Sequence, residues 1–192
     1  MRLLWLITAA ACLSSPSSSS PIVRDNKEQK CNGYSELCHR RYSDITWIGT
    51  HNAPFTGHGF ADNQHMRFDD QLKDGIRFLT IRTRGKHHKH LKVCHGKCLY
   101  RDAGRLKKFL IKTKSFLEDN PNEVVTLLLT NPDHQDIGRF QRELEKSGLD
   151  ELAYVGKEDG SRIEKEEWPT LRELIDMNKR AIIFLGVLCS PP

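Results

Sequence analysis

The chain contains 192 residues, of which 38% are hydrophobic and 29% are charged, and its formal net charge at pH 7 is +5. This length fits one domain of ordinary size. The positive excess is modest, so it favours an anionic surface or substrate and gives no reason to expect nucleic acid as a partner.

The first residues do not have the pattern of a folded domain. Arg2 is followed by an apolar run from Leu3 to Leu13 and then by the Ser/Pro-rich stretch SSPSSSSP. The apolar run is shorter than the roughly 20 residues that span a bilayer, and the pattern is typical of a secretory signal peptide. We therefore expect a signal peptide over 1–20, a linker over 21–30, and a secreted, extracellular protein whose domain covers 31–192.

Secretion changes how the cysteines are interpreted. The close spacings in CNGYSELC and CHGKC predict the disulfides Cys31–Cys38 and Cys94–Cys98. A zinc site is the alternative, because paired cysteines with nearby histidines can also supply metal ligands. Cys189 is left without a predicted partner.

After the linker, the apolar patterns predict strands that alternate with helices. In chain order we expect a strand over 45–50, a short helix over 66–75, strands over 76–84 and 90–96, a helix over 102–121, a buried strand over 123–132, helices over 136–148 and 168–178, and a strand over 179–188. Such alternation is typical of a parallel α/β sheet. A closed barrel needs about eight strands and this chain supplies about five, so we expect an incomplete α/β barrel.

Two histidines directly follow strand-like segments. His51 stands after TWIGT and before a turn, and His95 ends LKVCH before a glycine. Between them, Arg82 alternates with Leu79 and Ile81 and should face away from these apolar side chains. Because parallel barrel strands present functional side chains at their carboxyl ends, we expect His51, Arg82 and His95 to converge. The simpler alternative is that His51 only caps a turn.

Two histidines around an arginine suit phosphodiester chemistry. A neutral imidazole can take a proton from an attacking hydroxyl while a protonated one gives a proton to the leaving oxygen. Both states are accessible because the unperturbed pKa of histidine is about 6.5. The guanidinium group is a charged fork that matches phosphate oxygens.

The densest basic stretch is RGKHHKHLK, residues 84–92. It is either a solvated loop or a basic lip beside a phosphate-binding mouth, and in the second case Arg84 is expected to contact the substrate. Together with HGKC over 95–98, the histidines of this stretch also raise the alternative of a metal-binding protein.

Five segments carry a more specific resemblance. They are IGTHNAPF, QLKDGIRFLTIRTRG, VCHG, FLEDNPNEVVTLLLTN and WPTLRELI. In order and spacing they resemble the X-region of phosphatidylinositol-specific phospholipase C-like phosphodiesterases, above all the secreted, disulfide-bearing members. The resemblance runs from about Cys31 to about Leu185. It implies a TIM-type barrel and a role in lipid metabolism.

Matched position by position, the resemblance implies that His51 is the general base, His95 the general acid and Arg82 the phosphate-binding residue of the metal-independent bacterial type. Calcium-dependent relatives carry acidic ligands on the strand that here holds Thr80 and Arg82, so we expect no metal and no other cofactor. Asn52 is interpreted as a hydrogen-bonding group beside the substrate. The implied reaction is attack of an inositol hydroxyl on the adjacent phosphorus, which expels diacylglycerol and leaves a cyclic phosphate.

The family also places an aspartate from a late strand behind the first histidine, and no residue of this chain matches it. A second interpretation is therefore a truncated, inactive secreted protein that keeps the fold to bind phosphoinositide or glycan head groups. The expected partners are a phospholipid or other phosphodiester substrate and, peripherally, a membrane surface. The complete protein is expected to be a monomer. Glycerophosphodiesterases share the barrel but need early metal-binding carboxylates that we do not find here.

Overall fold

The computed structural model describes residues 29–86, 89–96, 98–157 and 159–186. The predicted signal peptide, most of the predicted linker and Cys189 lie outside these ranges.

The described residues form strands and helices close to the predicted positions. The strands are β1 (Gly49–Thr50), β2 (Phe78–Arg84), β3 (Lys92–His95), β4 (Arg101–Arg105), β5 (Val125–Thr130) and β6 (Ala181–Gly186). The α-helices are α1 (Phe68–Lys73), α2 (Leu106–Asp119), α3 (Ile137–Ser147) and α4 (Leu171–Asp176), and short 3-10 helices are η1 (Ser35–His39), η2 (Tyr42–Asp44), η3 (Leu149–Leu152) and η4 (Lys165–Glu167). The first predicted strand is reduced to its last residues, and β4 was not predicted, because residues 102–105 were assigned to the start of a helix.

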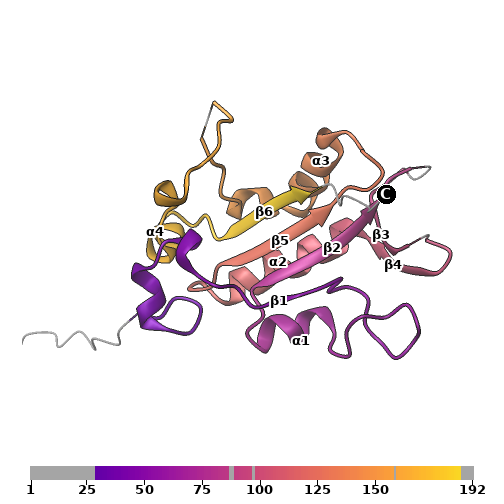
Figure 1. Ribbon diagram of the computed structural model, residues 1–192, viewed down its shortest axis with the longest axis horizontal. Helices are drawn as coiled ribbons and strands as arrows, with labels where there is room; N and C mark the ends of the chain where they lie inside the picture. Colours follow the sequence, from indigo (N-terminus) through magenta and orange to yellow (C-terminus); the bar gives the residue numbers. More distant parts are fainter. Residues whose placement is uncertain (1–28, 87–88, 97, 158, 187–192) are drawn as a thin grey trace, which may run out of the picture.

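The strands form one open sheet in the order β4-β3-β2-β5-β6, with β1 also paired to β2 (Figure 1). The pairs β1/β2, β2/β5 and β5/β6 are parallel, as the alternation predicts. The register places Arg82 of β2 beside Thr130 of β5, and Thr130 beside Gly186 of β6. The sheet does not close on itself within the described residues.

The direction of β3 corrects the sequence analysis, which treated it as another parallel strand. β3 pairs with both β2 and β4 in antiparallel fashion, so β3 and β4 form a hairpin at the edge of β2. Only residues 85–91 separate β2 from β3. A parallel crossover needs about a dozen residues or more, so this short link allows only an antiparallel return.

The two faces of the sheet differ in chemistry. One face packs against α2 and α3 and forms the main hydrophobic core, and Figure 1 shows α2 passing behind β2 and β5. In β2 this face carries the buried Leu79 and Ile81, whereas Thr80 and Arg82 alternate with them and are only partly buried. The face turned away from the helices therefore holds the polar side chains of β2.

The amino end of that polar face is covered by the segment that follows the first disulfide. The ring of Tyr42 packs between Trp47 and Trp168, with centroids 5.0 and 4.7 Å away, and its hydroxyl lies 2.8 Å from Oγ1 of Thr126 at the start of β5. Burial raises the pKa of Tyr42, and the hydrogen bond with Thr126 only partly offsets that rise. The aromatic cluster seals one end of the sheet and leaves the carboxyl ends of the strands for a site.

Candidate functional site

The two predicted histidines lie on the same edge of β2. β1 runs beside the first residues of β2, where Thr50 is opposite Leu79, and it ends just before His51. β3 starts opposite Arg84 and runs back in the other direction until it ends at His95. The ends of β1 and β3 therefore approach each other along one edge of β2, between the levels of Leu79 and Thr83.

The backbone around His51 is fixed by its neighbour Asn52. Asn52 is buried and adopts a left-handed conformation with φ 53°, and its backbone N–H donates to Oγ1 of Thr80 over 2.7 Å. The amide nitrogen of Asn52 lies 2.9 Å from Nε2 of His51 and 3.2 Å from Oδ1 of Asn63. An amide nitrogen only donates, so it holds the exposed ring of His51 through the lone pair of Nε2.

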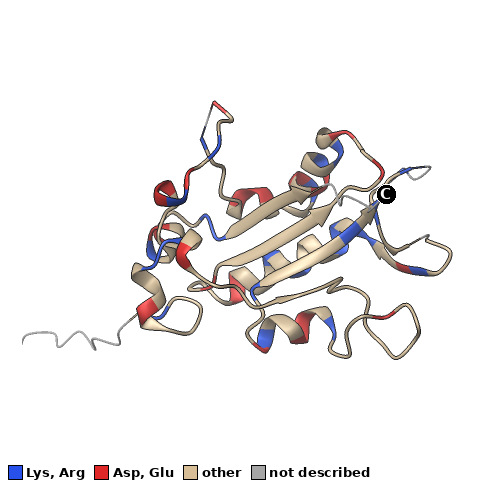
Figure 2. Ribbon diagram, in the orientation of Figure 1, with Lys and Arg blue, Asp and Glu red and all other residues tan. Residues whose placement is uncertain are grey.

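Arg82 presents an unsatisfied cation at the centre of this region. Its Nε is buried and has no hydrogen-bond partner within the part of the chain that the structure describes. Burial lowers the pKa of Arg82, the nearby charge of Arg84 lowers it further, and Asp133 acts in the opposite direction. Because the group remains charged in proteins, an anion that supplied the missing acceptor would relieve a desolvation cost. Figure 2 shows the basic residues at the carboxyl end of β2.

His95 is held by groups from the loop that follows His51. Its Nδ1 lies 2.8 Å from the carbonyl oxygen of Ala61, and its ring stacks on Phe55 with the centroids 5.3 Å apart. A carbonyl oxygen only accepts, so Nδ1 carries a proton and Nε2 is the ring nitrogen left for a substrate.

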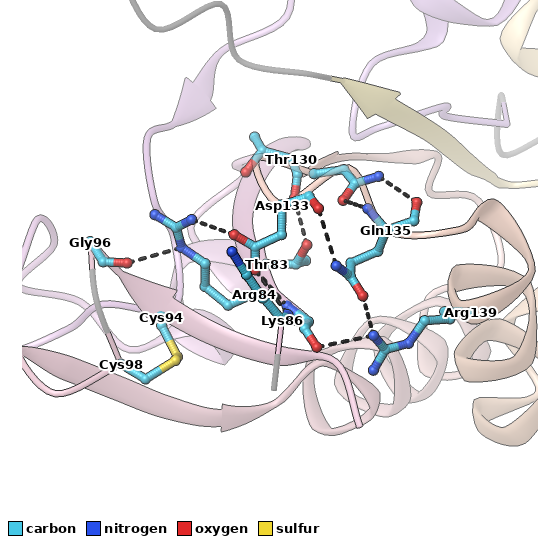
Figure 3. Close-up of polar contacts among 12 residues, drawn as sticks. Thr83, Arg84, Lys86, Cys94, Gly96, Cys98, Thr130, Asp133, Gln135 and Arg139 are labelled. Carbon is cyan, nitrogen blue, oxygen red and sulfur yellow. Dashed lines mark hydrogen bonds and ion pairs between the residues drawn. A yellow bond between two sulfur atoms is a disulfide. The ribbon is translucent and has the colours of Figure 1, made fainter. Parts of the chain in front are cut away.

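Arg84 takes part in a network that joins three elements (Figure 3). Its Nη1 donates to Oδ1 of Asp133 over 2.6 Å, and its Nε donates to the carbonyl oxygen of Gly96 over 3.0 Å. Oδ2 of Asp133 accepts from the backbone N–H groups of Gly85 and Lys86, at 2.9 and 3.1 Å. Burial alone would raise the pKa of Asp133, but these hydrogen bonds and the charge of Arg84 together lower it. With two nitrogens of Arg84 engaged in this way, its contact with substrate stays a prediction.

Both predicted disulfides are present, Cys31–Cys38 and Cys94–Cys98. The second encloses the residue His95 and the carbonyl of Gly96 that Arg84 binds, as Figure 3 shows for Gly96, Cys94 and Cys98. This disulfide therefore belongs to the support of the candidate site.

Sequence reasoning missed two groups of the region, Thr130 and Asp133. Thr130 lies beside Arg82 in the register, and its buried Oγ1 has no hydrogen-bond partner among the described residues. Asp133 follows β5 by a few residues in the stretch LTNPD. The rule that singled out His51, a polar residue at the carboxyl end of a parallel strand, would have found both.

Other predicted features have a more limited outcome. No three His, Cys, Asp or Glu side chains of the described residues gather in a way that could hold a metal ion. Residues 87, 88 and 97 of the two histidine-containing motifs lie outside the described ranges. Among the helices that the structure describes, none is long and apolar enough to cross a bilayer.

Comparison with known proteins gives consistent matches. The family model PI-PLC X matches residues 37–190. The PI-PLC X domain-containing protein 1 of Arthroderma benhamiae is 40% identical over 156 residues, which are 81% of this chain and 50% of the relative. An uncharacterized secreted protein of the same fungus is 39% identical over 81% of this chain and 35% of its own length. The chain thus spans half or less of the length of these relatives.

Solved structures show the same fold. The H258Y mutant of the phosphatidylinositol-specific phospholipase C from Staphylococcus aureus has a TM-score of 0.60 at 22% identity, over 78% of this chain and 50% of that one. The phosphatidylinositol-specific phospholipase C from Listeria monocytogenes has a TM-score of 0.57 at 18% identity, over 77% of this chain and 53% of that one. The fold predicted from the sequence, an incomplete TIM-type α/β barrel, is confirmed.

Proposed function

The chain belongs to the PI-PLC X family, and on that premise we propose that it is a secreted phosphoric diester hydrolase or lyase of the phosphatidylinositol phospholipase C type that works without a metal ion. The observation that carries the proposal is the Nε of Arg82, which is buried and has no hydrogen-bond partner among the described residues. His51 and His95 stand at the ends of the two strands that pair with the same edge of β2. Secretion is supported by the signal-like start of the sequence, the two disulfides and the similarity to a secreted fungal protein.

In the proposed reaction, each residue has one role. His51 takes the proton of an inositol ring hydroxyl, whose oxygen then forms a bond to the adjacent phosphorus. Arg82 binds the phosphate oxygens and stabilises the charge that develops on them. The bond from phosphorus to the glycerol oxygen breaks, and the protonated Nε2 of His95 gives that oxygen its proton, so the products are a cyclic inositol phosphate and diacylglycerol.

A lipid substrate is favoured by apolar side chains at the rim. Phe60 is 93% exposed in the loop that contacts His95, and Leu99 is 89% exposed in the turn between β3 and β4, next to the exposed Tyr100. Exposed apolar side chains that gather into a patch mark surfaces that contact a membrane or another protein. Their place beside the candidate site supports peripheral contact with a phospholipid surface during the reaction.

The test is release of cyclic inositol phosphate from phosphatidylinositol vesicles. We expect His51→Ala and His95→Ala each to lower kcat by about 10²- to 10⁴-fold, the usual contribution of a positioned acid or base. His39→Ala is the control, because His39 is exposed in η1 and belongs to a different part of the fold. Full activity of either site variant, or equal loss in all three, would contradict the proposal.

One observation favours the second interpretation, a head-group-binding protein without turnover. The ring of His51 contacts Asn52, and no hydrogen bond joins it to a carboxylate among the described residues. The same vesicles distinguish the two: binding that needs the inositol phosphate head group and Arg82, with no cyclic product, would identify a binding protein.

A further inference from the structure

His95 and Arg101 face each other across the β3–β4 hairpin, as directly paired residues of the antiparallel ladder. Side chains of such a pair lie on the same face of a hairpin. Both reach the same loop, residues 56–64: His95 contacts the carbonyl of Ala61, and Arg101 donates from Nη2 to the carbonyl of Thr56 over 2.8 Å. One cross-strand pair therefore holds this loop at two points.

Arg101 makes a second contact in the loop, with the residue that follows Ala61. Its Nε lies 2.7 Å from Oδ1 of Asp62 in an ion pair, and both atoms are buried. The angle between them is not that of a hydrogen bond, so the contact acts through charge. Oδ2 of Asp62 accepts the backbone N–H of Gly59 over 3.0 Å, and the N–H of Asp62 donates to the carbonyl of Gly59 over 3.0 Å. The carboxylate thus ties the hairpin to the turn that contains Ala61.

The position of the Ala61 carbonyl decides which nitrogen of His95 is protonated. Ala61 is buried and its carbonyl oxygen accepts from Nδ1 of His95. If this oxygen moved away, the neutral ring would lose the contact that distinguishes its two nitrogens, and both tautomers would be populated. A general acid needs its proton on the nitrogen that faces the leaving group, here Nε2, with Nδ1–H held by the protein.

We propose that Asp62 and Arg101 are positioning residues, which hold the Ala61 carbonyl against His95 and so keep its Nδ1 protonated and its Nε2 toward the substrate. The effect on catalysis rests on the proposed function, whereas the effect on the ring of His95 does not. Among the described residues, neither side chain forms a hydrogen bond with the ring of His95, and both act through the loop.

The test is nitrogen-15 NMR of the histidine side chains in the full chain, with the His95 signals assigned by their loss in His95→Gln. In the spectrum of the neutral ring, the wild type should show the Nδ1–H tautomer. In Asp62→Asn, we expect a mixture of the two tautomers and, in the vesicle assay, a fall of about tenfold in kcat with little change in KM, the size expected for one hydrogen bond.

Glu123→Gln is the matched control. Glu123 accepts from Nε of Arg77 over 2.6 Å, in an ion pair whose carboxylate is about as buried as that of Asp62, but the pair lies at the amino ends of β2 and β5. This variant should lower the thermal midpoint while the His95 spectrum and kcat stay as in the wild type. A similar spectral change in both variants would mean that loss of any such ion pair disturbs His95.

A pure Nδ1–H tautomer in a folded Asp62→Asn protein would overturn the proposal. If circular dichroism shows that this variant is unfolded, Arg101→Lys decides, because it keeps the charge opposite Asp62 but loses the fork that also reaches Thr56. We expect Arg101→Lys to lose part of the Nδ1–H tautomer, and an unchanged His95 spectrum in this variant would also contradict the proposal. If the wild type makes no cyclic product, the proposed function fails while the tautomer result stands.

Discussion

The side-chain amide of Asn52 lies 2.9 Å from Nε2 of His51, the residue that precedes it in the chain. Two adjacent residues meet in this way because Asn52 has a positive φ of 53°, which turns its side chain back toward the preceding ring. The amide is itself fixed by Asn63, at 3.2 Å. Base catalysis by His51 then requires that Nε2 exchange this donor for the hydroxyl of the substrate.

Asn52→Gly should show whether the amide orients His51. Glycine adopts the same positive φ without strain, so the variant removes the amide and keeps the backbone. We expect kcat to fall about tenfold with little change in KM, because one orienting hydrogen bond is lost. Asn178→Gly is the matched control, since Asn178 has φ 54° and follows α4, far along the chain from the site. An unchanged kcat in Asn52→Gly would show that the amide of Asn52 does not orient His51 for catalysis.

Arg82→Lys tests the contact with phosphate. Lysine keeps the positive charge but replaces a planar fork with a point charge, so at least one hydrogen bond to the phosphate oxygens is lost. Hydrogen bonds to charged groups contribute about 1.5–3 kcal/mol, which predicts a loss of about 10- to 150-fold in kcat/KM. Arg142→Lys, on the exposed side of α3, should leave the rate unchanged. A near-normal rate for Arg82→Lys would assign the phosphate to another residue.

The two disulfides should differ in their effect on activity. Each closes a short loop, so replacing either pair by alanine is expected to lower the free energy of unfolding by about 2–3 kcal/mol. Only Cys94–Cys98 encloses His95, whereas Cys31–Cys38 packs in the aromatic end of the molecule. Chemical denaturation of both double variants together with the vesicle assay checks this. Equal loss of activity at matched stability would show that Cys94–Cys98 has no special role in holding the histidine.

The regular elements could be predicted because their residues carry strong local patterns. α2 has apolar residues at helical spacing, and β5 is a continuous buried run, so both appear close to their predicted positions. The direction of β3 could not be predicted from its own residues, because periodicity carries no information on strand direction. β4 has the sequence RDAGR, without β-branched residues, and becomes a strand only through its pairing with β3.

The site divides in the same way. His51, Arg82 and His95 could be selected from the sequence by chemistry and by their place at strand ends. The groups that hold them could not, because they come from distant parts of the chain: the Ala61 carbonyl is 34 residues from His95, and Asp133 is 49 residues from Arg84. Contacts of this kind depend on the register of the hairpin and on loop conformation, which leave no local pattern.

Activity is expected to survive chelation. At the positions where a calcium site would need carboxylates, Thr80 accepts the backbone N–H of Asn52, and Arg82 places a positive charge. The vesicle assay should therefore give the same rate in EDTA as in calcium, once the effect of calcium on the vesicles is matched with magnesium. Loss of rate in EDTA that calcium restores would contradict this expectation and make Asn52 a candidate ligand.

Asp133 should make stability depend on pH in the acid range. Its pKa in the folded protein is below the ordinary value, because the effect of burial is outweighed by the hydrogen bonds from the N–H groups of Gly85 and Lys86 and by the charge of Arg84. In the unfolded chain its pKa returns to about 3.9. The ionised carboxylate therefore stabilises the folded state at all pH values above about 3.9, and this contribution is lost as the pH falls through the lower, folded pKa.

Asp133→Asn should have a lower thermal midpoint than the wild type near neutral pH, and the difference should shrink on acidification below about pH 4. Asp136→Asn, which removes an exposed carboxylate at the start of α3 that makes no capping hydrogen bond, is the control and should show no such trend. If the difference in thermal midpoint between Asp133→Asn and the wild type is the same at neutral and acid pH, the charge of Asp133 does not stabilise the contact between β2 and the loop after β5.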